Sequence, residues 1–262
     1  MTGIARRTKF LIFTIFYIFG CLVFEYIKFD KLVFLGIFVL LIVITNLIAL
    51  YPGYALKDIF YISFQPLVIS IGTIAGLIYF PNLNEFFKLT LILASGFLLY
   101  ISTLTNNLVI AEKIEDSSLP LFRVGLIWTQ ILLIVQSIPL ITVIYKLDLI
   151  FIYQSLIIIL YFISASIIYI HTLLLSRKNE AITNREVGLI VIQMVYLPFL
   201  ASISTSFIPA ESFLRATFVT STFMGMVGYS RNYIENSITR NLVVQYSLIS
   251  LFFLVVLFIF NP

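Results

Sequence analysis

The chain has 262 residues, of which 61% are hydrophobic and only 11% are charged, and its net charge is +4. A soluble domain usually carries about 25% charged residues, because its surface must face water. The composition therefore excludes a soluble globular protein. It indicates an all-α membrane protein, in which runs of roughly 20 apolar residues cross the bilayer as helices with internally satisfied backbones.

Two residue counts exclude further classes of protein. Cys21 is the one cysteine and His171 the one histidine, so an internal disulfide, a cysteine cluster and a multi-histidine metal site are excluded. The basic residues lie at the ends of apolar segments and form no patch with interleaved aromatic residues, which excludes nucleic-acid binding. No feature of the sequence calls for a cofactor or a metal.

Nine apolar segments follow one another along the chain. The first and eighth are the weakest, because the first is short and the eighth begins with Arg215 and contains several Thr, Ser and Gly residues. We therefore predict a single transmembrane domain over residues 1–262, a bundle of eight or nine spans without a soluble domain. The predicted spans are 10–24, 32–51, 59–80, 88–110, 121–145, 149–175, 187–209, 212–228 and 242–260.

The loops between these segments predict the orientation of the chain. With nine spans, 11 of the 16 Lys and Arg residues fall on the side of the N-terminus and 5 on the other. Basic loops stay in the cytoplasm, so the N-terminus is predicted to be cytoplasmic, in what the composition suggests is a bacterial inner membrane. Nine spans place the C-terminus outside, whereas eight spans place it inside.

The third segment carries a predicted helix-packing face. Gly72 and Gly76 form a GxxxG motif, which lets two helices approach closely, and Gln65 shares their face seven residues earlier. Pro66 in the same segment removes a backbone donor, so neighbouring groups must satisfy the carbonyl that it frees. Pro139 and Pro198 are expected to kink the fifth and seventh segments in the same way.

The sixth segment carries a mostly polar stripe on an otherwise apolar helix. Gln154, Tyr161, Ser164, His171 and Thr172 recur near a seven-residue spacing, which places them on one face. Ionisable groups inside a membrane point to function, and histidine can relay a proton near neutral pH. The stripe is thus a candidate polar path, although a histidine this close to a helix end is also common at the membrane interface.

Two arginines lie just inside their spans. Arg123 belongs to the fifth segment and Arg215 to the eighth. Long basic side chains near helix ends extend to the membrane interface, and there either arginine is a candidate contact for a lipid phosphate. Membrane lipid is accordingly one predicted partner.

Three hypotheses about function remain. The chain contains no H-E-x-x-H, P-loop or G-x-S-x-G motif, so the leading hypothesis is a non-enzymatic scaffold that binds another membrane protein or a second copy of itself. The second is a small transporter or lipid-handling permease that uses the stripe on the sixth span. The third is an enzyme on a lipid-linked substrate, with His171, Arg123 or Glu25 in its active site.

Overall fold

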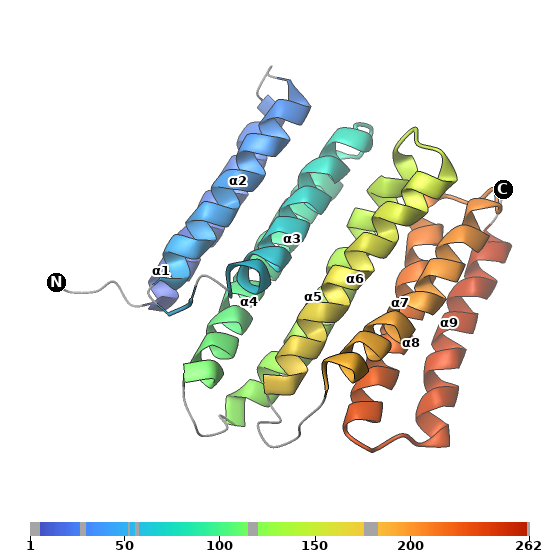
Figure 1. Ribbon diagram of the computed structural model, residues 1–262. Coiled ribbons are helices and arrows are strands. Elements are labelled where there is room, and N and C mark those ends of the chain that lie inside the picture. The colour runs from blue at the N-terminus through green and yellow to red at the C-terminus, as the bar shows by residue number, and fades with distance from the viewer. Residues whose placement is uncertain are drawn as a thin grey trace. The chain divides into compact units, whose positions relative to one another are not determined.

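The computed structural model describes residues 6–26, 30–51, 53–55, 58–114, 120–175 and 183–260. Within these ranges the chain forms α-helices and no strand, which confirms the all-α prediction (Figure 1). Each predicted segment falls on one helix. The helices are α1 (Arg6–Tyr26), α2 (Lys31–Leu50), α3 (Ile59–Tyr79), α4 (Glu85–Ile114), α5 (Pro120–Lys146), α6 (Phe151–Leu175), α7 (Asn184–Ser206), α8 (Ser212–Ile234) and α9 (Arg240–Ile259).

Eight of these helices are long and apolar enough to cross a membrane, and α8 is the exception. The chain is thus a multi-pass helical membrane protein. The helix α8 also differs from the predicted segment 212–228, because it continues to Ile234. It ends where Asn236 takes a positive φ of 49°, a conformation that asparagine tolerates better than most residues.

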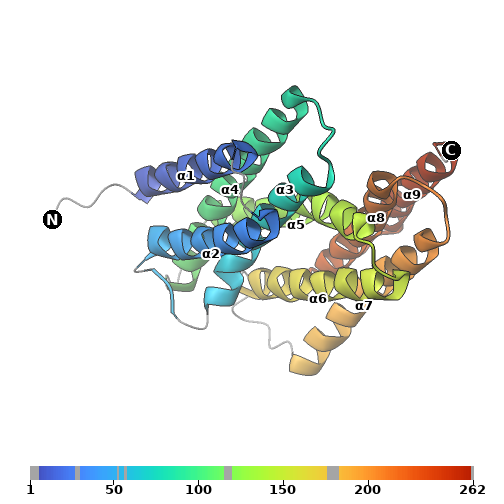
Figure 2. The same ribbon diagram turned by 90° about the horizontal axis from the view of Figure 1, so that it is seen from above.

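Residues 1–136 and 137–262 form two compact units, and α5 runs from one into the other. In the first unit α1 and α3 each pack against both α2 and α4 (Figure 2). These contacts make a four-helix bundle in which each pair of consecutive helices is antiparallel. The expectation of a single transmembrane domain stays a prediction.

Glycines and one tyrosine fix the position of α1 in this bundle. Gly20 lies directly against the Phe38 ring of α2, and Gly96 of α4 lies directly against the Ile18 side chain. The fully buried Tyr17 hydroxyl donates a hydrogen bond of 3.2 Å to Ser95 Oγ on α4. Because lipid does not drive apolar helices together, such close backbone approach and interhelical hydrogen bonds hold the bundle.

Pro66 explains a second set of interhelical bonds in the first unit. It lies inside α3 and cannot donate to the carbonyl of Ile62 one turn earlier. Two asparagines replace the missing donor: Asn106 Nδ2 of α4 lies 2.9 Å from the Ile62 oxygen, and Asn46 Nδ2 of α2 lies 3.3 Å from it. The expectation that neighbours satisfy this carbonyl is therefore met by side chains from two different helices.

We predict that Asn106→Leu lowers the free energy of unfolding by about 0.5–2 kcal/mol, because it removes the shorter of the two bonds to a buried carbonyl. In a Pro66→Ala background the loss should be smaller, since the backbone amide that alanine restores at this position can donate to the Ile62 carbonyl. Titrating SDS into the protein in mild detergent measures the free energy of unfolding in both backgrounds. Equal losses in the two backgrounds would contradict this role for Asn106.

The second unit is a row rather than a closed bundle. The helix α6 packs on α7, α7 on α8 and α8 on α9, and α6 also touches α8. The aromatic rings of Phe162 on α6 and Phe223 on α8 stack with their centroids 4.4 Å apart. The helix α9 packs chiefly on α8 and buries only Leu257 among its side chains, so α7 and α9 flank α8 without closing over it.

Candidate functional site

A groove of about 760 Å³ lies between α7 and α9, and α8 forms its floor. Its volume falls within the range of about 300–1,000 Å³ that is usual for small-molecule sites. Its lining consists mostly of apolar side chains, with hydroxyl and amide groups at intervals. The lining residues are Gln193, Leu197, Leu200, Ala201, Ser204, Thr205, Ile208, Phe218, Thr222, Gly225, Met226, Tyr229, Asn232, Ile238, Leu242, Val243, Tyr246, Ser247, Ser250, Leu251 and Leu254.

Small residues of α8 determine how α9 borders this groove. The phenol of Tyr246 rests on Gly228, where a Cβ atom would overlap the ring. At Gly225 an added Cβ would lie 3.6 Å from Tyr246 Cβ and 3.9 Å from Ser250 Oγ. Ser250 Oγ also donates a 3.4 Å hydrogen bond to the carbonyl of Ser221. The groove therefore depends on the close contact between α8 and α9.

We predict that Gly228→Ala displaces Tyr246 and lowers the free energy of unfolding by about 1–3 kcal/mol, as overpacking does. Gly225→Ala should have little effect, because its new methyl group has room. A Tyr246→Leu background should reduce the cost of Gly228→Ala, since the obstructing ring is then absent. Thermal unfolding in detergent measures each variant, and equal effects of Gly228→Ala and Gly225→Ala would contradict the prediction.

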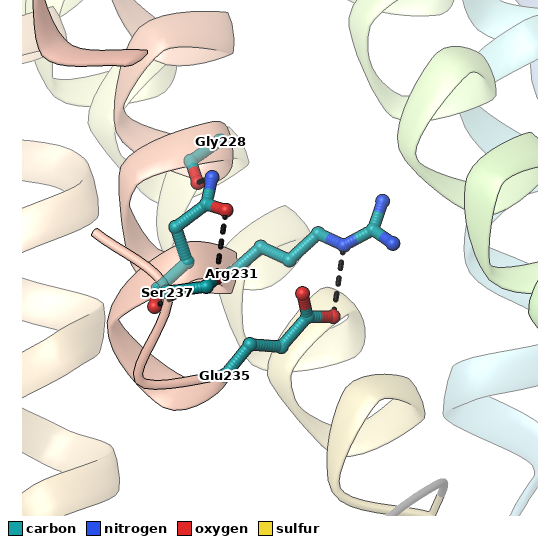
Figure 3. Close-up of polar contacts among 5 residues, drawn as sticks. Gly228, Arg231, Glu235 and Ser237 are labelled. Atoms are coloured by element: carbon teal, nitrogen blue, oxygen red, sulfur yellow. Dashed lines mark hydrogen bonds and ion pairs between the residues drawn. The ribbon is translucent and has the colours of Figure 1, made fainter. Parts of the chain in front are cut away.

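At the C-terminal end of α8 the polar groups bond to one another. Arg231 Nε donates to Glu235 Oε1 at 3.0 Å (Figure 3). Asn232, which lines the groove, donates its amide to the Gly228 carbonyl at 2.8 Å and accepts from the Ser237 hydroxyl at 3.0 Å. These contacts satisfy the side chains of Arg231 and Asn232 locally at the end of α8.

The opposite end of the groove adjoins a buried group of hydroxyls. The Tyr145 hydroxyl of α5 lies 3.1 Å from Thr205 Oγ1 and donates to Ser202 Oγ at 3.2 Å. Ser202 Oγ in turn donates to Ser155 Oγ on α6 at 3.2 Å. Thr205 also lines the groove, so the network links three helices to its wall. The guanidinium of Arg215 lies over the Tyr145 ring, 5.9 Å from its centroid.

The predicted polar path on the sixth span lies apart from the groove. None of its five residues is among the groove lining. Gln154 donates to the Leu147 carbonyl at 2.8 Å, whereas Ser164 and Thr172 donate to carbonyls of their own helix at 2.9 and 2.8 Å. Tyr161 is buried and His171 is half-buried. A polar path along α6 stays a prediction.

The predicted packing face on the third span lies inside the first unit. Gly72 and Gly76 are buried, and Leu91 of α4 lies 3.6 Å from the position that a Gly76 Cβ would take. Gln65 is also buried, and its Oε1 accepts a hydrogen bond of 3.0 Å from Ser102 of α4. The face is thus occupied by the chain's own helices.

The two candidate phosphate contacts differ in their surroundings. Arg123 is exposed on α5, whereas Arg215 is half-buried against Tyr145. Among the described residues no group of three or more His, Cys, Asp or Glu side chains could hold a metal ion. Asp58 and Lys113 of the first unit form an ion pair with each other.

No pattern in the sequence predicts the groove. Its floor residues recur at helical spacing along α8, but a sequence cannot show that one neighbour of a helix face is missing. Comparisons of this chain with family models, with curated proteins and with solved structures find no match.

Proposed function

We propose that this protein binds a membrane lipid in the groove between α7 and α9. The observation that carries the proposal is the groove itself, an apolar channel on the side of a membrane-length helical unit. This is the lipid-handling function among our hypotheses, assigned to α7, α8 and α9 in place of the stripe on α6.

The dimensions of the groove favour a hydrocarbon chain as the ligand. Its floor runs from Phe218 to Asn232 of α8, which is about 21 Å at 1.5 Å per residue. The side chains along this length are mostly apolar, so a hydrocarbon chain lying in the groove leaves few polar groups without a partner.

The scaffold hypothesis has less support from the described residues. It rests on the absence of catalytic motifs from the sequence. The small-residue face of Gly72 and Gly76, which could have met a partner, is buried within the chain's own first unit. From Leu248 to Ile259 the exposed side chains of α9 are all apolar, and lipid is a suitable neighbour for such a surface. Binding of another membrane protein or of a second copy of the chain stays a proposal, and we assign no docking face to it.

We predict that Ser204→Trp reduces the retention of lipid by the purified protein several-fold. Ser204 is exposed on the groove wall, so an indole at this position obstructs the groove. Ile192→Trp is the matched control, because Ile192 is an exposed residue of the same helix outside the groove lining. Native mass spectrometry after mild detergent extraction should find bound lipid on the wild type and Ile192→Trp, and several-fold less on Ser204→Trp. Equal lipid on all three proteins would refute the proposal.

We also propose that α8 crosses the membrane, which gives nine spans. The helix lies between α7 and α9 and is about as long as its neighbours. Its hydroxyls are largely satisfied internally: Thr217, Ser221 and Thr222 donate to carbonyls of their own helix at 2.7–2.8 Å. Such bonds reduce the cost of placing hydroxyls in a membrane. With a cytoplasmic N-terminus, the C-terminus then lies outside a bacterial inner membrane.

Cysteine labelling in a Cys21→Ala background tests this topology. We predict that a membrane-impermeant maleimide added to intact cells labels Pro262→Cys and leaves Thr8→Cys unlabelled. Detergent-opened cells, in which both cysteines should react, provide the control. Protection of both cysteines in intact cells would indicate eight spans. Labelling of Thr8→Cys in intact cells would show that the N-terminus lies outside, opposite to the predicted orientation.

A further inference from the structure

Arg215 lies one turn of α8 before Phe218, the first residue of the groove floor, and is not itself among the lining residues. It precedes the lining residues Phe218 and Thr222 by three and seven positions, a spacing that places all three on one face of a helix. Its guanidinium also stacks over Tyr145, whose hydroxyl contacts the lining residue Thr205. Two independent features, the helix register and the ring contact, therefore bring this cation to the end of the groove.

The charge of Arg215 has no partner in the part of the chain that the structure describes. No carboxylate there pairs with it, although Glu211 is only one turn away in sequence, and its Nε is buried without a hydrogen-bond acceptor. A partly buried guanidinium near a membrane surface is costly unless an anion pairs with it. The structure thus records no carboxylate for this guanidinium and no acceptor for its Nε.

At the other end of the groove the cation and the lining amide already have partners within the chain. There Arg231 pairs with Glu235, and the groove-lining Asn232 is bonded to Gly228 and Ser237. An anionic group is thus favoured at the Arg215 end, and the chain of a bound lipid would extend from there toward Asn232.

We propose that Arg215 binds the phosphate of an anionic phospholipid whose acyl chain occupies the groove. The inference rests on the proposed lipid-binding function and names the class of lipid. Arginine suits this role, because its planar fork meets two phosphate oxygens at once. The Tyr145 ring supports the guanidinium from one side, and bonds to Ser202 and Thr205 hold that ring in place. Tyr145 is accordingly a positioning residue.

Native mass spectrometry with defined lipids tests the proposal. The full-length protein is delipidated and offered equal amounts of phosphatidylglycerol and phosphatidylcholine with identical acyl chains. We expect the wild type to bind phosphatidylglycerol at least about fivefold more than phosphatidylcholine, the ratio that one cation gives near an anionic surface. Arg215→Gln should bring the ratio close to one while phosphatidylcholine binding persists. An equal ratio for the wild type and Arg215→Gln would overturn the proposal.

Arg123→Gln is the matched control, because it removes an exposed arginine of the other unit and should leave the ratio unchanged. An equal effect of both substitutions would mean that only net charge matters and would overturn the assignment to Arg215. Arg215→Lys, which keeps the charge but lacks the planar fork, should give an intermediate ratio and guards against a folding defect of Arg215→Gln. Millimolar inorganic phosphate should not displace the lipid, and displacement would indicate a site for free anions.

The outcomes separate the two proposals. Loss of both lipids in Ser204→Trp, together with an unchanged ratio in Arg215→Gln, would support lipid binding and refute the phosphate contact. Full lipid binding by Ser204→Trp would refute the groove as the lipid site. In that case a ratio that still depended on Arg215 would indicate a surface contact outside the groove.

Discussion

Polar groups inside a membrane must find partners within the protein, because lipid offers neither donors nor acceptors. This requirement explains the least regular contacts of the structure. The carbonyl of Ile62, freed by Pro66, receives one amide from α2 and another from α4. One missing donor on α3 therefore links three helices of the first unit. The proline creates a bonding need that only a specific arrangement of neighbours meets, so it helps to specify the bundle.

In the second unit the polar groups lie mainly on α8, which is less apolar than the other described helices. Some of them bond to other helices of the unit, as in the 3.1 Å hydrogen bond from Ser137 of α5 to Thr220. Its glycines and serines admit α9 closely on one side. Since α7 takes the other side, the remaining strip of α8 becomes the groove floor. The groove therefore results from the packing of α7 and α9 on two sides of α8, which leaves one strip of α8 uncovered.

The sequence predicted the helices well, because a run of apolar residues as long as the bilayer is thick has few alternatives. It also predicted that the carbonyl freed by Pro66 would need partners, but Asn46 and Asn106 lie far from it in sequence and carry no local signal. The sequence shows the Thr, Ser and Gly residues of the eighth segment, yet a face that packs and a face that lines a groove have the same spacing. Arg215 was recognised by its place near a helix end, whereas its contact with Tyr145 depends on the fold.

The distribution of charge near the groove bears on how a lipid would lie in it. Uncharged polar side chains, among them Gln193, Ser204 and Ser247, line the groove at intervals. The hydroxyls of Thr222 and Ser250 are bonded to the carbonyls of Val219 and Ser221. Within the described ranges, the guanidinium of Arg215 stands without an anion at one end of the groove. In the complex that we propose, the phosphate of the lipid lies at that end and its chain along the apolar floor, which gives the ligand one orientation.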